Sequence, residues 1–151
     1  MDAGRPAEAE NFFRTAMSAG PYNRQVIYGL SQCLEKLGKK DEAKQLGDKL
    51  TQMQADSKRL DQLTHEAMKK PHDPGLRYEI GMIFMRNGFT DDAVRWLTSA
   101  LKENPAHQPA RAALVEHYER TGNAEAAARH RRFLENTSPQ NASGTRGGES
   151  P

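Results

Sequence analysis

Apolar side chains recur along most of this chain at intervals of three or four residues, and polar side chains fill the positions between them. One such stripe follows residue 73 and consists of Leu76, Ile80, Ile83 and Phe84. This spacing places the apolar side chains on one face of an α-helix. Asp73-Pro74 predicts the start of the helix, because Asp accepts bonds from free amides and Pro suits the first helical position. Gly88 predicts its end, since glycine readily adopts the left-handed conformation.

A second apolar stripe follows directly and predicts a second helix. It consists of Ala93, Trp96, Leu97, Ala100 and Leu101. Thr90 is expected to cap this helix, and Asp91-Asp92 suits its positive N-terminal end. The helix is expected to stop at Asn104-Pro105, because the residue before proline avoids the helical conformation. Residues 73–105 are therefore predicted to form two helices joined by a short turn.

The same pattern recurs 34 residues later. Gly88 recurs as Gly122, and the surrounding residues keep the interval, as in Ile80 and Leu114, Phe84 and Tyr118, or Ala93 and Ala127. A fixed interval of this length is typical of a stacked array of helix-turn-helix units. Further units are predicted over residues 107–135 and, around Gly38, over residues 22–54.

The array is expected to begin with half a unit. Its apolar positions are counterparts of those in the second helix above, and they are Ala9, Phe13, Ala16 and Pro21. Residues 4–20 are therefore predicted to form a second helix without its first, which leaves an apolar face uncovered. This favours the hypothesis that the chain is the C-terminal piece of a longer array, such as an accessory or regulatory arm of a larger protein that could be an enzyme.

One interval departs from the period. Gly38 and Gly88 lie 50 residues apart, which is 16 more than the repeat, and residues 48–70 contain neither Gly nor Pro. Either one helix runs from about residue 41 to residue 70, or the helix breaks near Ala55-Asp56-Ser57, where Asp or Ser could cap a new segment. We favour the break, since helices in globular proteins rarely exceed about 20 residues. It predicts an inserted helix over residues 57–70.

Composition limits the class of protein. Only 36% of residues are hydrophobic, and helix-forming residues dominate, which indicates an all-α fold with much solvated surface. The net charge of +2 is too small to favour nucleic acid, and no apolar run is long enough to span a membrane. The first residues lack a secretion signal, so a cytoplasmic location is expected. Residues 136–151 have no large apolar side chain and are predicted to be a disordered tail.

The sequence offers no pattern typical of catalysis, of a metal site or of a bound cofactor. Five histidines are scattered without zinc-binding spacing, and no glycine-rich phosphate loop is present. The single cysteine, Cys33, lies in an apolar stretch and is expected to be buried. Arg129-His130-Arg131-Arg132 could bind an anionic partner, but cations also suit the end of a solvated helix, which is the interpretation we favour. We therefore predict a protein that is not an enzyme.

The repeat resembles the tetratricopeptide repeat family. In the clearest unit the resemblance is carried by Ile80, Gly81, Phe84, Gly88, Ala93, Leu97, Ala100 and Pro105. The tryptophan that is frequent early in this repeat is replaced by Ile27, Arg77 and Arg111. The resemblance implies an α-solenoid, a right-handed superhelix of antiparallel helix pairs.

In this family the first helices line a concave groove that holds a segment of a partner protein. The resemblance places eight side chains there, namely Tyr28, Gln32, Tyr78, Met82, Met85, Arg86, Glu116 and Arg120. Tyr and Arg are frequent at binding hot spots, and Met suits adaptable surfaces. The alternative is that Tyr78 and Met82 only pack against the next helix. We predict a scaffold that binds a peptide or helix of a protein partner, with no nucleic acid, membrane or cofactor, and with an oligomeric state that the sequence leaves open.

Overall fold

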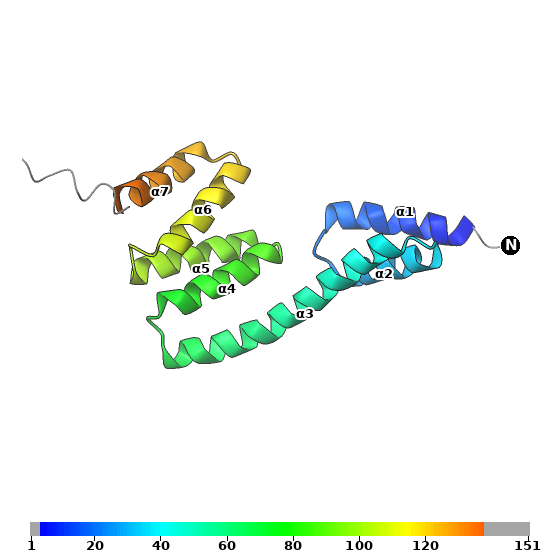
Figure 1. Cartoon of the computed structure of the whole chain (residues 1–151), viewed down its shortest axis with the longest axis horizontal. Coiled ribbons are helices and arrows are strands. Elements are labelled where there is room, and N and C mark those ends of the chain that lie inside the picture. The colour runs from blue at the N-terminus through cyan, green and yellow to red at the C-terminus, as the bar shows by residue number, and fades with distance from the viewer. Residues whose placement is uncertain (1–3, 138–151) are drawn as a thin grey trace, which may run out of the picture. The chain divides into compact units, whose positions relative to one another are not determined.

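Seven α-helices run through residues 4–137, the part of the chain that the computed structural model describes (Figure 1). They are α1 (Gly4–Ala19), α2 (Arg24–Lys36), α3 (Lys40–Lys69), α4 (Pro74–Arg86), α5 (Thr90–Glu103), α6 (Gln108–Arg120) and α7 (Ala124–Thr137). The predicted all-α fold of paired helices is confirmed. The chain divides into two units, residues 1–62 and residues 63–151, and the boundary lies within α3. The predicted tail was placed too early at residue 136, because α7 continues to Thr137, and its remainder lies outside the described residues.

Three glycines form the turns inside the helix pairs. Gly38, Gly88 and Gly122 follow α2, α4 and α6, and their φ angles are 74°, 82° and 77°. This left-handed conformation is costly for residues that carry a Cβ atom, so a glycine at each of these turns stops the first helix and lets the chain reverse. The glycine turns predicted from the 34-residue interval are therefore confirmed.

The N-terminal cap of α4 agrees with the prediction from the sequence, and that of α5 disagrees with it. Asp73 Oδ1 accepts the backbone N–H groups of Gly75 and Leu76 at 2.8 and 3.1 Å, which confirms the predicted start of α4. The prediction that Thr90 caps α5 is wrong, because the capping position is Phe89, whose side chain makes no capping hydrogen bond. The Phe89 ring instead packs edge-on against Phe84 at 6.0 Å, so an apolar contact replaces the polar cap at this turn.

The first unit contains α1, α2 and the beginning of α3. Its core consists of Leu30, Leu34 and Ala43, with Phe13, Met17 and Leu46 packed against it. Ser31 Oγ donates a hydrogen bond to the Ala43 carbonyl oxygen at 3.2 Å, which joins α2 to α3 inside this core. The predicted half unit is thus a helix that packs on the next helix pair.

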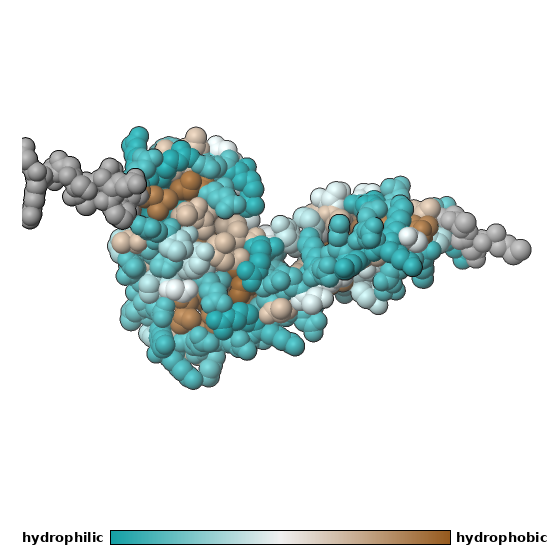
Figure 2. Space-filling model, in the orientation of Figure 1, coloured by the Kyte–Doolittle hydropathy of each residue, from teal (hydrophilic) through white to brown (hydrophobic). Residues whose placement is uncertain are grey.

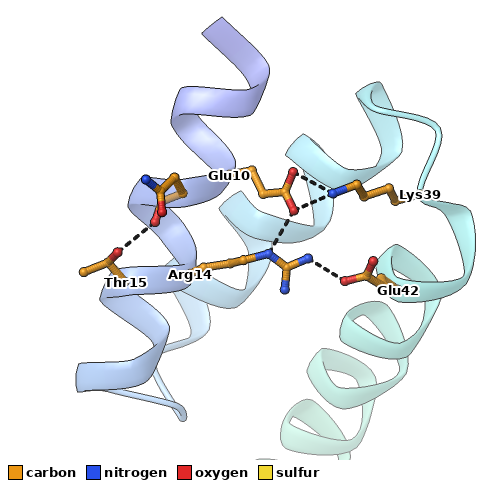
Figure 3. Close-up of polar contacts among 6 residues, drawn as sticks. Glu10, Arg14, Thr15, Lys39 and Glu42 are labelled. Atoms are coloured by element: carbon orange, nitrogen blue, oxygen red, sulfur yellow. Dashed lines mark hydrogen bonds and ion pairs between the residues drawn. The ribbon is translucent and has the colours of Figure 1, made fainter. Parts of the chain in front are cut away.

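A cluster of four charged side chains joins α1 to the start of α3 (Figure 3). Lys39 Nζ donates to both carboxylate oxygens of Glu10, at 2.8 and 3.0 Å, and Arg14 Nε donates to the same carboxylate at 2.8 Å. Arg14 Nη2 also donates to Glu42 at 2.5 Å. The hydrogen bonds from Lys39 and then Arg14 lower the pKa of Glu10. Ionised Glu10 therefore helps to hold α1 against the start of α3, and its ion pairs with Lys39 and Arg14 are lost once it is protonated.

The second unit contains the end of α3 and the two pairs α4–α5 and α6–α7. Its core consists of Leu97, Ala100, Ala110 and Leu114, which come from α5 and α6. Gly81 lets α4 approach α5 closely, since a Cβ atom at this position would lie only 2.9 Å from Leu97 Cγ. Burial of such apolar side chains is the main source of stability in helical repeats, because each pair can cover its apolar face only with a neighbour.

The predicted break at residues 55–57 is wrong, and so is a separate inserted helix over residues 57–70. Helix α3 is continuous over 30 residues and appears as one ribbon in Figure 1. Asp56 is buried and accepts a hydrogen bond from Gln52 Nε2 at 2.9 Å, one turn earlier, instead of capping a new helix. Leu63 and Pro71 lie 34 residues before Leu97 and Pro105. The end of α3 therefore has the residue pattern of a second helix of the 34-residue repeat. The beginning of α3, which follows Gly38, has this pattern as well.

Candidate protein-binding site

The eight predicted groove residues fall into two groups. Tyr28 and Gln32 lie on α2 in the first unit, and the other six lie on α4 and α6 in the second unit. Each group forms a face of its own unit. On the side drawn in Figure 2, hydrophilic side chains cover most of the surface, and apolar colour is confined to small areas.

In the second unit the apolar groove residues form the contact between α4 and α6. Tyr78, Met82 and Met85 are half-buried and pack against the core. The ring of Tyr78 lies 5.3 Å from that of His107, and Arg120 Nη2 contacts Met85 Sδ at 3.7 Å. The sequence left open whether Tyr78 and Met82 bind a partner or pack on the next helix. The packing role is present, and the half-buried side chains keep part of their surface in solvent.

The charged groove residues of the second unit lie on the same two helices, α4 and α6, as this contact. Arg86, Glu116 and Arg120 are exposed. Glu116 and Arg120 are four residues apart on α6, so they share one face of that helix. The second unit therefore offers apolar surface together with side chains of both charges.

In the first unit Tyr28 borders a groove of about 370 Å³ between α2 and α3, whereas Gln32 is not one of its lining residues. Tyr28 is 60% exposed beside it, and the lining residues are Arg24, Gln25, Tyr28, Leu50, Thr51 and Gln54. Among these lining residues Tyr28 was predicted from the sequence, and the three residues of α3 were not. The interval of 50 residues between Gly38 and Gly88 was the sequence signal for two of them. At this interval Leu50 and Thr51 correspond to Ala100 and Leu101, which contribute to the core of the second unit.

The basic residues near the end of the chain are engaged with α6. Arg131 forms an ion pair with Glu119, and the His130 ring stacks on that of Tyr118 at 5.8 Å. Burial lowers the pKa of His130, and the charges of Arg111 and Arg129 lower it further. Two members of the basic cluster thus contribute to the packing of α7.

Three further properties of the described part of the chain concern metal-binding groups, the cysteine and membrane-spanning helices. Residues 4–137 contain no group of three His, Cys, Asp or Glu side chains arranged to hold a metal ion. Cys33 is only half-buried, so the prediction of a buried cysteine is wrong. No helix among the described residues is long and apolar enough to cross a membrane.

Comparison with known proteins identifies the repeat. A family model described as tetratricopeptide repeat matches residues 1–66, and a second model with this description matches residues 53–137. The chain belongs to the tetratricopeptide repeat family. Repeats of this family are protein-interaction modules, so the chain is a scaffold for protein partners in this general sense. No curated protein matches the chain.

Two solved structures with a related fold support the assignment of a helical repeat. "Crystal structure of MamA" is 16% identical, covers 87% of this chain and 88% of its own, and has a TM-score of 0.51. "MamA RS-1 ArsTM double mutant" is 18% identical, covers 93% and 89%, and has a TM-score of 0.50. At these identities the likeness concerns the tetratricopeptide fold alone.

The tetratricopeptide repeats of this chain hold the turns between helix pairs with basic side chains. Arg77 donates to the Pro71 carbonyl, and Arg111 Nη2 donates to the Pro105 carbonyl at 2.7 Å. These two arginines replace the early tryptophan of the family. In the first unit Lys49 Nζ donates to the Pro21 carbonyl at 2.7 Å. A cation at this place is favourable because the carbonyl end of a helix is partly negative.

Proposed function

We propose that this chain is a non-enzymatic scaffold that binds a segment of a partner protein along its first helices. The proposal is carried by one observation, the half-buried side chains of Tyr78, Met82 and Met85 on α4 together with exposed charges on α4 and α6. A partner segment laid along this face would contact the exposed parts of these side chains and the charged groups on both helices.

The chemistry of the face favours a protein segment as the ligand. Methionine side chains are flexible and polarizable, so they adapt to different apolar partners. Exposed charges beside an apolar centre orient a partner and speed its approach more than they add affinity. Arg86, Glu116 and Arg120 are all exposed, so the face offers both signs of charge. A polyanion such as nucleic acid would meet an unfavourable carboxylate here, whereas a peptide with alternating charges would not.

Cross-linking would locate the partner. A photoreactive amino acid placed at Glu116 or, in a second variant, at Lys102 on α5 would be activated in extracts of the source cells. Both positions are exposed. We expect a specific protein adduct from the Glu116 position and no such adduct from Lys102. Equal labelling at both positions, or none at Glu116, would count against the face on α4 and α6.

A further inference from the structure

The groove between α2 and α3 in the first unit has a counterpart in the second unit, where a helix fills it. Its lining residues Tyr28, Leu50 and Thr51 lie 50 residues before Tyr78, Ala100 and Leu101. In the second unit these counterparts pack with Ala110 and Leu114 of α6 in one apolar core.

The difference between the two units comes from α3. After Asn104 the second unit turns and continues into α6, which returns to cover Tyr78. The residue 50 positions earlier is Gln54, and there α3 continues as a helix. No residue directly after Gln54 can then fold back into the groove, and Tyr28 is 60% exposed.

The second unit also defines the direction in which a helix would lie. Tyr78 near the start of α4 contacts His107 before α6, and Met85 near the end of α4 contacts Arg120 at the end of α6. Helix α6 therefore runs parallel to α4. A helix seated in the same way in the first unit would run parallel to α2.

The charges along the groove suit a helix in this direction. Arg24 lines the groove at the start of α2, and Glu35 takes the place of Met85 near its end. Both side chains are exposed. Acidic residues are favoured at the N-terminal end of a helix and basic residues at its C-terminal end. Such a helix would place its acidic end at Arg24 and its basic end at Glu35.

Helix α3 has open space at Gly47. Gly47 stands where the second unit has Leu97, and a Cβ atom on Gly47 would meet nothing within 4 Å. Gly47 is not one of the residues that line the groove, so the apolar contacts of a bound helix would come from Tyr28 and Leu50.

We infer that the groove of α2 and α3 is the binding site for an amphipathic helix of a partner protein. The helix would resemble α6 in its length of 13 residues, in a small residue and a leucine four positions apart, and in its basic last turn. Unlike α6, it would have an acidic first turn, which would face Arg24. This inference rests on the proposed function, since it names the kind of partner that one face of the scaffold would take.

The test uses a peptide with the sequence of α6. A peptide of residues 107–121 would be synthesised with Gln108→Glu and held helical by a hydrocarbon staple between positions 112 and 116. It would carry a fluorescent label, and its binding to the full chain would be measured by fluorescence anisotropy. We expect saturable binding, with NMR shift changes centred on Tyr28 and Thr51. Thr51→Arg should weaken binding about tenfold or more, whereas Thr98→Arg on α5, also exposed, should not.

A charge exchange tests the predicted direction. The Arg24→Glu chain should bind a peptide with Gln108→Lys better than the Gln108→Glu peptide, and the unmodified chain should show the opposite preference. The inference is overturned by an absence of binding, by a preference independent of Arg24, or by shift changes confined to α4–α7. If the chain self-associates and Thr51→Arg abolishes the self-association, the groove binds a second copy of the chain, and the inference is overturned as well. Cross-linking at Glu116 tests the other face, so either proposal can fail alone.

Discussion

Leu97 of α5 packs directly against Gly81 of α4, and a Cβ atom on Gly81 would lie 2.9 Å from Leu97 Cγ and 3.3 Å from the Ala93 carbonyl oxygen. In the first unit the corresponding pair has the opposite sizes, because Ser31 replaces the glycine and Gly47 replaces the leucine. Ser31 Oγ donates to the Ala43 carbonyl, the counterpart of the Ala93 carbonyl. The first unit thus joins its first and second helix here by a hydrogen bond, where the second unit uses the contact between Gly81 and Leu97.

Gly81→Ala is expected to destabilise the second unit. The added methyl group meets the fully buried Leu97, and overpacking of this kind costs about 1–3 kcal/mol. Gly47→Ala is the matched control, because its methyl group meets nothing and Ala favours a helix by about 1 kcal/mol over Gly. Urea unfolding should give changes of opposite sign. A stabilising Gly81→Ala would show that α4 and α5 are less closely packed.

Arg77→Ala is expected to loosen the turn before α4. Arg77 Nη2 contacts Glu103 Oε1 at 3.1 Å and also donates to the Pro71 carbonyl. Loss of a partly buried charged donor leaves these acceptors without their partner, at a cost of about 1–3 kcal/mol. Arg95→Ala removes an exposed arginine whose ion pair with Asp92 is worth about 0–1 kcal/mol. Equal changes in the melting temperature for both variants would contradict the role given to Arg77.

Glu10→Gln is expected to loosen the attachment of α1 to the start of α3. The substitution removes the carboxylate that binds Lys39 and Arg14 and keeps the size of the side chain. Amide hydrogen exchange in α1 should become faster, and the difference should shrink at high salt because exposed ion pairs are screened. Glu8→Gln, an exposed position on the same helix, should leave the exchange of α1 unchanged.

Mild acid is expected to destabilise the pair α6–α7. Burial and Arg120 lower the pKa of His117, and burial with Arg111 and Arg129 lowers that of His130. The unfolded chain then binds protons at a higher pH than the folded one, so stability is full above about pH 6.5 and falls as the pH drops through the unfolded value. Melting temperatures at pH 7.5 and 5.5 should differ less in a His117→Gln, His130→Gln variant. Exposed His65→Gln provides the control.

The sequence predicted the features that depend on residues close together in the chain. The glycine turns and the Asp73 cap need only a few neighbouring residues, and the 34-residue interval repeats them. The continuity of α3 was missed because Asp56 can either cap a helix or bond to Gln52, and only its burial favours the second. The half-buried state of Met82 was left open, since it depends on the packing of α6.

The affinity of a cross-linked and identified partner for two charge-reversal variants is the most direct test of the scaffold. Arg86→Glu with Glu116→Lys changes only exposed side chains on the face of α4 and α6, and Arg95→Glu with Glu125→Lys makes the same kind of change at exposed positions on α5 and α7. Measured by calorimetry, the first variant should bind the partner about tenfold more weakly or worse, and the second should bind it like the unmodified chain. Equal affinity of all three proteins would contradict the claim that the first helices hold the partner.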